Sequence, residues 1–365
     1  MIFLDNNSTT PLDKIVETKM MDALTINYGN PHSNFHKFGV DAKKSLEKSR
    51  AIVSDFFKVE DENVIFTSGA TESNNMIIQG AAIKAKNDGN ARNKIFCSSI
   101  EHKCVLESVK SCVNKGFETH IIPVTANGLV DMNWLEKHLD DKTLLVSVMT
   151  INNETGLRTN IEEIGVICKK YGVFFHSDVA QALHGERLDL DELNIDAISI
   201  SGHKINGPKG IGSLIFNENP SNFIAPIIYG GLQEQSMRSG TVPVFLAVAL
   251  SSALEVLDND FLKFKEHTIK LKKIFLDEIQ KQSNNIHLNF NMINAHPGTL
   301  NLYLNEVDAD MICMRLGDKV AVSSTAACNG TNFEYSYVLK NMGLSDEIAK
   351  SSIRLCFGRH NTKTE

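Results

Sequence analysis

Residues 173–216 read VFFHSDVAQALHGERLDLDELNIDAISISGHKINGPKGIGSLIF, and this stretch decides the fold class. It holds three runs of strand length that are mostly apolar or β-branched, at residues 173–178, 197–202 and 212–216. Such hydrophobicity is typical of strands that are buried on both faces of a sheet. Asp178 ends the first run, and His203 and Lys204 follow the second. The stretch therefore predicts neighbouring strands of an α/β domain, with reactive side chains at their ends.

The alternation of strand-like and helical patterns extends outward over residues 63–216. Further strand-length runs are NVIFTS, KIFCSS and TLLVSVM, at residues 63–68, 94–99 and 143–149. Helical patterns cover residues 72–87 and 161–172, and Gly172 closes the second of them. Repeated β–α alternation favours a mostly parallel sheet with helices on both of its faces.

The pattern changes after residue 242, which predicts a second domain. Residues 243–280 have the pattern of long helices and no strand signal. Shorter strand-like and helical runs then alternate up to residue 358, as in an α+β unit. We expect a large α/β domain at residues 16–258, and a small α+β domain formed by residues 1–15 and 259–365.

Composition excludes several classes of protein. The 365 residues are 42% hydrophobic and 22% charged, which is ordinary for a globular protein. The net charge of −7 and the lack of a basic stripe give no reason to expect nucleic-acid binding. No apolar run is long enough to cross a bilayer, and the N-terminus lacks the pattern of a signal peptide. The seven cysteines include no C-x-x-C pair and no zinc-site spacing, so we expect a cytoplasmic protein without a metal site.

Polar clusters stand at the ends of five predicted strands. They are residues 68–74, 101–102, 152–154, 178–181 and 202–204. Ligands of open α/β sheets bind beyond the carboxyl ends of the strands. We therefore expect these five clusters to meet in one crevice.

Lys204 and Asp178 are the two residues of this crevice with the most specific chemistry. A lysine held neutral by desolvation can attack an aldehyde, and glycines surround Lys204 in the run SGHKINGPKGIG. A carboxylate at the end of a buried strand needs a partner, and a protonated pyridine nitrogen is one. Gln181 would then face the phenolic oxygen of the same ring. A surface lysine, and a helix cap or salt bridge at Asp178, are the competing interpretations. The combination favours pyridoxal phosphate, attached to Lys204.

Two further segments of the crevice are less specific. Ala70 and Thr71 would open a helix with free N–H groups, which stabilise a phosphate. For that segment alone, an ordinary helix cap by Ser68 or Thr71 is the better interpretation. His102 could stack on an aromatic cofactor or transfer protons, although a lone histidine is more often structural.

Cys328 differs from the other cysteines by its surroundings. It lies in SSTAACNGTN, residues 323–332, a small polar segment that predicts an exposed loop. The other six cysteines follow strand or helix patterns and are interpreted as small core residues. An accessible thiol can act as a nucleophile. An incidental loop cysteine is the alternative.

Together these motifs resemble those of the cysteine desulfurases, pyridoxal-phosphate enzymes of the class V aminotransferase group. The resemblance runs from Leu4 to His360. Its most specific pieces are GNPHSNFHKFG, FTSGATESNN, EHKCVLES, NNETG, HSDVAQ, SGHKINGPKGIG, MRSGT and SSTAAC. It implies an α/β fold of type I, in which the large domain holds a mostly parallel seven-stranded sheet. The smaller α+β domain is implied to carry the cysteine loop.

The resemblance also implies the catalytic roles. Lys204 holds pyridoxal 5′-phosphate and later moves protons on the substrate, and His102 is the third catalytic residue. Cys328 attacks the sulfur of L-cysteine and becomes a persulfide, which leaves L-alanine. Arg354 binds the substrate carboxylate, for which a guanidinium is well shaped, next to Asn153. The implied cofactor contacts are Lys204, Ala70, Thr71, Ser201 and His203 at the phosphate end, His102, Asn153, Asp178 and Gln181 around the ring, and Thr241 reaching across a homodimer.

The loop from Cys328 to Tyr337 has the length found in the branch that passes sulfur to an iron–sulfur scaffold protein. We therefore expect a homodimer that supplies sulfur for iron–sulfur cluster assembly and for tRNA thiolation. Its partner is the scaffold or another sulfur acceptor, and Cys328 can contact a cluster during transfer. Relatives continue beyond the position of Glu365 as a helical tail, so we expect a naturally short member or a truncated chain. A selenocysteine lyase or another β-eliminating enzyme is the alternative; a non-enzymatic subunit fits the reactive residues poorly.

Overall fold

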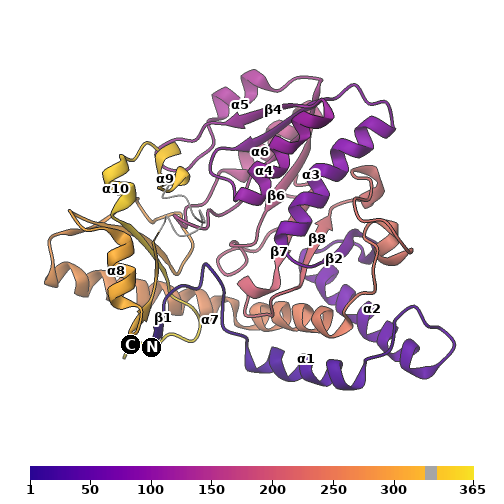
Figure 1. Cartoon of the computed structure of the whole chain (residues 1–365), viewed down its shortest axis with the longest axis horizontal. Coiled ribbons are helices and arrows are strands. Elements are labelled where there is room, and N and C mark those ends of the chain that lie inside the picture. The colour runs from indigo at the N-terminus through magenta and orange to yellow at the C-terminus, as the bar shows by residue number, and fades with distance from the viewer. Residues whose placement is uncertain (325–334) are drawn as a thin grey trace.

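A seven-stranded sheet with the strand order β2-β8-β7-β6-β5-β3-β4 forms the centre of the molecule (Figure 1). The computed structural model describes residues 1–324 and 335–365. The strands are β2 (Val64–Thr67), β3 (Lys94–Ser98), β4 (Glu118–Ile122), β5 (Thr143–Ser147), β6 (Phe174–Asp178), β7 (Ala197–Ser201) and β8 (Gly212–Phe216). From β7 to β4 the neighbours pair in parallel, whereas β8 runs antiparallel to both β2 and β7. The prediction of a mostly parallel α/β sheet is confirmed.

Six of these strands coincide with the apolar runs in the sequence, and β4 does not. All six are buried along most of their length, and in β6 and β7 every residue is buried. Strand β4 lies at the sheet edge, and only its last residue, Ile122, is buried. A half-exposed edge strand carries mixed polar and apolar residues, so its sequence gives no continuous hydrophobic signal.

Helices cover both faces of the sheet. They are α1 (Lys14–Ile26), α2 (Lys37–Phe57), α3 (Ala70–Asn87), α4 (Lys103–Ser111), α5 (Met132–His138), α6 (Ile161–Tyr171) and α7 (Val244–Gln282). One face packs with α3 and α4 in an apolar cluster that includes Ile65, and the other packs with α1, α2, α6 and α7 in a cluster that includes Val64 and Phe66. Successive residues of β2 thus point to opposite faces, as the pleat of a strand requires.

Two helix ends show how the local sequence sets these elements. Gly172 ends α6 with φ of 60°, a left-handed conformation that glycine adopts without steric cost. His102 caps the N-terminus of α4, because its imidazole accepts a hydrogen bond from the backbone N–H of Cys104. The predicted end of the helix at Gly172 is confirmed.

A smaller four-stranded antiparallel sheet, β12-β13-β10-β9, lies beside the larger unit (Figure 1). Its strands are β9 (Ile286–Leu288), β10 (Thr299–Leu304), β12 (Ser323–Ser324) and β13 (Ser352–Cys356), and its helices are α8 (Ala309–Leu316), α9 (Tyr337–Asn341) and α10 (Asp346–Lys350). Residues 320–324 contribute to two different strands. One is β12, and the other is β11 (Val320–Ala321), which pairs in parallel with β1 (Ile2–Phe3). The start of the chain therefore lies beside residues 320–321, and Asp5 lies beside Cys356 of β13.

Helix α7 joins the two units as one helix of 39 residues. Its first part packs on α1 and α2, and Leu271 and Phe275, further along it, pack in the apolar cluster of the smaller sheet. The predicted boundary at residues 258 and 259 falls inside this helix, and the division into residues 16–258 and the remainder stays a prediction. Within residues 1–324 and 335–365, no helix combines the length and apolarity that a bilayer span requires.

Candidate active site

A cavity of about 450 Å³ opens at the carboxyl ends of the large sheet's strands. The strand-end clusters predicted from the sequence meet there, together with the start of α3 and with Arg354 from β13. The lining residues are Asn7, Ser8, Ser68, Gly69, Ala70, Thr71, Glu72, His102, Cys104, Met149, Ile151, Asn153, Asp178, Ala180, Gln181, Ser201, His203, Lys204, Lys209, Gly210 and Arg354. The expected convergence on one crevice is confirmed.

Asp178 ends β6 at the inner wall of this cavity and is almost fully buried. Its Oδ2 accepts a hydrogen bond of 2.7 Å from Nδ2 of Asn74, and its Oδ1 accepts one of 2.9 Å from the backbone N–H of Ala180. These two donors fix the orientation of the carboxylate. An oriented negative charge at this depth is a suitable partner for a protonated ring nitrogen.

His102 lies opposite Asp178 at the start of α4. Its Nδ1 accepts the backbone N–H of Cys104 at 3.2 Å and lies 3.0 Å from the Cys104 sulfur. Burial lowers the pKa of His102 below its usual value, and Lys204 and Lys103 lower it further, while Asp178 acts in the opposite direction. The ring is therefore neutral at pH 7 and suited to stacking on an aromatic ligand.

Lys204 follows β7 at the end of a short 3-10 turn, Gly202–Lys204. Its Nζ donates to the backbone carbonyls of Asn7 and Ser8, the second at 3.0 Å. Gln181 donates to the same carbonyl of Asn7 at 2.7 Å. The N-terminal segment thus places two backbone acceptors beside the lysine amine, inside the cavity.

The start of α3 forms the end of the cavity that suits a phosphate. Gly69 precedes the helix with φ of 147°, and no side chain caps the N–H groups of the first turn. Ser201 and His203 line the same region, and burial, together with Lys204 and Lys209, lowers the pKa of His203 to about 4. An α-helix of 18 residues with uncapped N–H groups favours an anionic ligand at this end.

Glu72 brings a carboxylate to that same region. Burial disfavours its charge, but hydrogen bonds from Arg238 and Ser68 outweigh that effect and hold the pKa of Glu72 below its usual value. The Nε atom of Arg238 lies 2.8 Å from the Glu72 carboxylate. Arg238 compensates the negative charge of Glu72, so Glu72 repels a nearby phosphate less than an unpaired carboxylate would.

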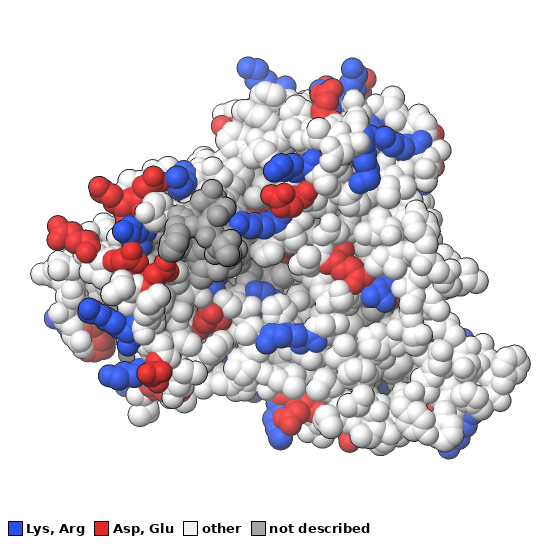
Figure 2. Space-filling model, viewed as in Figure 1, with Lys and Arg blue, Asp and Glu red and all other residues white. Residues whose placement is uncertain are grey.

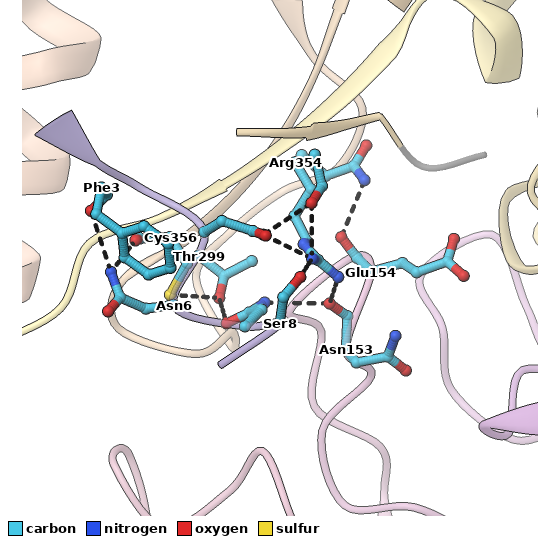
Figure 3. Close-up of polar contacts among 12 residues, drawn as sticks. Phe3, Asn6, Ser8, Asn153, Glu154, Thr299, Arg354 and Cys356 are labelled. Carbon is cyan, nitrogen blue, oxygen red and sulfur yellow. Dashed lines mark hydrogen bonds and ion pairs between the residues drawn. The ribbon is translucent and has the colours of Figure 1, made fainter. Parts of the chain in front are cut away.

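Arg354 enters the cavity from the smaller sheet (Figure 3). Its Nη1 donates to the backbone carbonyl of Asn153 at 2.9 Å, and its Nη2 lies 2.8 Å from Asp5 and 2.6 Å from the hydroxyl of Ser8. Only 5% of the residue is exposed. The guanidinium therefore ties the N-terminus, the loop after β5 and strand β13 to the rim of one cavity.

Most of the residues predicted for the site line this cavity. Those brought together are Lys204, Ala70, Thr71, His102, Asn153, Asp178, Gln181, Ser201, His203 and Arg354. Thr241 is exposed and does not line the cavity of its own chain. Its role in the site of a partner subunit stays a prediction. Cys328 lies outside the described residues, and its role likewise stays a prediction.

Four residues of the site carry contacts that the sequence did not indicate. Asn7 organises Lys204 and Gln181, Asn74 holds Asp178, Glu72 pairs with Arg238, and Cys104 contacts His102. The sequence offered one signal for three of them: Asn7 lies within the polar motif LDNNSTTP, and Glu72 and Asn74 lie within SGATESNN. Cys104 gave none, because it follows a helical pattern. No group of three or more metal-ligating side chains occurs in the described part of the chain.

Comparison with known proteins identifies the family. The model of the aminotransferase class-V family matches residues 2–365. The chain belongs to this family. A cysteine desulfurase, IscS, of Rickettsia bellii (strain OSU 85-389) is 43% identical over 364 residues, which cover all of this chain and 88% of that protein. A solved NifS-like protein superposes with a TM-score of 0.91 at 31% identity, over all of this chain and 95% of its own. A structure described as SspA in complex with cysteine gives 0.87 at 29% identity, over 99% of this chain and 100% of its own.

Class-V aminotransferases use pyridoxal phosphate, and the residues of this class-V site fit that cofactor. The oriented carboxylate of Asp178 suits the ring nitrogen, the uncapped start of α3 suits the phosphate, and the amine of Lys204 lies in the same cavity. Gly69 allows the backbone to turn into this end of the cavity, since its φ of 147° is a conformation that residues with a side chain rarely adopt. These residues would hold the cofactor.

Proposed function

We propose that this enzyme is a pyridoxal-phosphate-dependent cysteine desulfurase that converts L-cysteine to L-alanine and supplies the sulfur for iron–sulfur cluster assembly and tRNA thiolation. One observation carries the proposal. In a chain 43% identical to a cysteine desulfurase over its whole length, Lys204, Asp178 and Arg354 all line one cavity. That combination provides a cofactor anchor, a partner for the ring nitrogen and a cation for the substrate carboxylate.

Arg354 binds and orients the substrate in this proposal. Its positive charge is shared with Asp5, and one of its remaining partners is the neutral hydroxyl of Ser8. A carboxylate accepts a stronger hydrogen bond than a hydroxyl does, so the carboxylate of L-cysteine can replace Ser8 on the guanidinium. Asn153, whose backbone carbonyl also binds Arg354, lies next to that position.

Lys204 and Asp178 serve the chemical step. The cofactor, when bound, accepts the electron pair that develops on the substrate carbon. Asp178 holds a proton on the ring nitrogen, which keeps the ring electron-poor. The amine of Lys204 accepts and returns the substrate proton, and the neutral imidazole of His102 covers the ring and excludes water from it.

Cys328 is the sulfur acceptor in the proposal. Its thiolate attacks the substrate sulfur, a sulfur–sulfur bond forms, the carbon–sulfur bond breaks, and the electron pair passes to the substrate carbon, which is then protonated to give L-alanine. The six described cysteines support this choice by their environment. Burial raises the pKa of every one of them, to about 12 at Cys104 and about 11 at Cys313 and Cys356. Thiols of that kind supply little thiolate at neutral pH.

The proposal includes a homodimer that works in the cytoplasm with a scaffold protein or another sulfur acceptor. Thr241 supports the dimer, since it is exposed and stands away from the cavity of its own chain, where a neighbouring subunit could use it. All six described cysteines are free, which is typical of a reducing compartment. The large domain at residues 16–258 is proposed to hold the cofactor, and the remainder to hold Cys328.

The test supplies purified protein with pyridoxal phosphate, L-cysteine and a reductant, and measures L-alanine and sulfide. We expect equal amounts of both from the wild type and neither from Cys328→Ser. Cys313→Ser is the matched control, because Cys313 is half-buried on α8 and lies outside the cavity, and it should retain full activity. Full desulfuration by Cys328→Ser would disprove the assigned nucleophile.

A second measurement tests whether Lys204 binds the cofactor, independently of the desulfuration assay. Borohydride should bleach the yellow wild-type protein and leave the cofactor covalently attached after denaturation, whereas Lys204→Ala should release it. If the wild type released selenium from L-selenocysteine but no sulfur from L-cysteine, the enzyme would be a selenocysteine lyase instead.

A further inference from the structure

Cys104, which the sequence predicted to be a small core residue, lies between His102 and Asn74 at the wall of the cavity. Its sulfur lies 3.0 Å from Nδ1 of His102 and 3.2 Å from Nδ2 of Asn74. The same Nδ2 of Asn74 lies 2.7 Å from Oδ2 of Asp178. A continuous chain of polar contacts therefore connects Asp178, through Asn74 and Cys104, to His102.

The direction of each hydrogen bond in this chain follows from the groups involved. The Asp178 carboxylate can only accept, so the Asn74 atom that faces it must be the amide nitrogen. That nitrogen has a second hydrogen, which points to the Cys104 sulfur. The Thr71 hydroxyl also bonds to the sulfur. Because the sulfur accepts from these neighbours, its own proton is directed to the remaining partner, Nδ1 of His102.

The thiol keeps that proton at neutral pH. Burial raises the pKa of Cys104 to about 12, and the negative charge of Asp178 raises it too, although Asn74 and Thr71 act in the other direction. Nδ1 of His102 then accepts two hydrogen bonds, from the backbone N–H and from the thiol of Cys104. A nitrogen that accepts cannot carry a proton, so the ring proton is on Nε2.

We propose that Cys104 is a positioning residue whose thiol, oriented by Asn74, holds His102 neutral with its proton on Nε2. The chain of contacts then links the two residues that flank the cofactor ring in the proposed function. A positively charged His102 would repel both a protonated ring and Lys204, so a fixed neutral ring favours cofactor binding. The inference rests on the proposed function only in assigning His102 to the cofactor.

Three charged groups also act on His102, and each comes from a different part of the cavity wall. Asp178 lies at the end of β6, Lys204 follows β7, and Lys103 is on α4 itself. None of these is altered when Cys104 is replaced. Burial also lowers the pKa of His102. A change shared by a smaller and a larger replacement of Cys104 therefore reports the lost thiol contact.

The test uses full-length protein loaded with pyridoxal phosphate and labelled with ¹⁵N in histidine. Nitrogen-detected NMR spectra over a pH series give the tautomer and the titration midpoint of His102. Cys104→Ala and Cys104→Val both lack the donor and bracket the volume of cysteine, whereas Cys104→Ser keeps a donor. Cys112→Ala is the matched control, since Cys112 directly follows the same helix but does not line the cavity.

We expect the His102 midpoint to rise by about 0.5–1 pH unit in the alanine and valine variants, which is the contribution of one hydrogen bond. The dissociation constant of pyridoxal phosphate should rise about three- to tenfold in the same variants. Cys104→Ser should stay close to the wild type, and Cys112→Ala should match it. A wild-type midpoint and tautomer in either donor-free variant would overturn the proposal, whatever the outcome of the desulfuration assay.

Discussion

The two sides of the active-site cavity are assembled in opposite ways. The strand-end side consists of Ala70, His102, Asp178 and Lys204, and the closing side of Asp5, Ser8, Asn153 and Arg354. Each residue of the strand-end side stands at the end of a strand or the start of a helix of the large unit. The residues of the closing side are as much as 349 positions apart in the chain, and the guanidinium of Arg354 contacts all three of the others. The first side is a product of the fold, and the second depends on one side chain.

The charge on each side shows the same contrast. On the strand-end side, Asp178 has two neutral donors, Asn74 and the backbone N–H of Ala180. On the closing side, Arg354 pairs with the carboxylate of Asp5 at 2.8 Å, and neither is fully exposed. Removal of one member of a buried ion pair leaves the other without compensation, which is more costly than loss of a neutral hydrogen bond.

The largest effect is therefore expected from Arg354→Met. We expect it to lower the free energy of unfolding by about 3 kcal/mol, near the lower end for buried pairs because Asp5 is partly exposed. The KM for L-cysteine should rise strongly as well, since the substrate carboxylate loses its cation. Urea denaturation and steady-state kinetics measure the two effects.

Arg359→Met is the matched control for this comparison. Arg359 pairs with Asp13 and Asp260 near the same chain end but does not line the cavity. Its loss should cost less than that of Arg354, because its side chain is 21% exposed against 5% for Arg354, and it should leave KM unchanged. The double variant Asp5→Asn with Arg354→Met should recover part of the stability but none of the substrate binding. If Arg354→Met were no less stable than Arg359→Met, the closing side would not depend on that ion pair.

The sequence predicted the strand-end side well for a physical reason. Its residues follow apolar runs such as those ending at Asp178 and Ser201, and the ends of parallel strands meet wherever the sheet places them. On the closing side, only Asn153 follows a strand-like run in this way. Arg354 lies inside a buried strand, and only the resemblance to a family pointed to it. Its partner Asp5 could not be predicted, because no local rule relates two residues 349 positions apart.

Asp178→Asn probes the strand-end side and should affect rate more than stability. We expect the turnover number for L-alanine to fall by about 10²–10³-fold, the loss typical of one oriented electrostatic group. The fold should tolerate the change, because the Oδ1 atom of Asn74 has no partner among the described residues. A rotated Asn74 amide can therefore accept a hydrogen bond from the new side chain.

The control for this variant is Asp196→Asn. Asp196 is half-buried against the large sheet, where it accepts the backbone N–H of Phe175 at 2.7 Å, but it lies outside the active-site cavity. It should keep full turnover. Equal turnover in the two variants, with thermal unfolding temperatures close to the wild type, would show that Asp178 is only a structural carboxylate.

Glu101 links the two units behind the cavity, and its effect should be smaller and dependent on pH. Burial raises the pKa of its carboxyl to about 8, despite hydrogen bonds to Oε1 from Ser98 and from the backbone N–H of Met149. Tyr337 of α9 donates to the backbone carbonyl of the same residue. The smaller unit thus contacts the backbone of a residue whose side-chain carboxyl is protonated in the folded protein.

The sign of the pH effect follows from the two protonation states. In the unfolded chain this carboxyl loses its proton near its ordinary pKa of 4.5, whereas the folded chain retains the proton up to about pH 8. Folding between these values takes up a proton, so stability falls as pH rises through this window. Glu101→Gln cannot titrate, and the other groups are common to both proteins. We therefore expect the variant to gain stability relative to the wild type by as much as about 1.4 kcal/mol per pH unit. Urea denaturation at several pH values between 5 and 8 measures this difference, and a difference that stays constant with pH would mean that Glu101 is ionised in the folded protein.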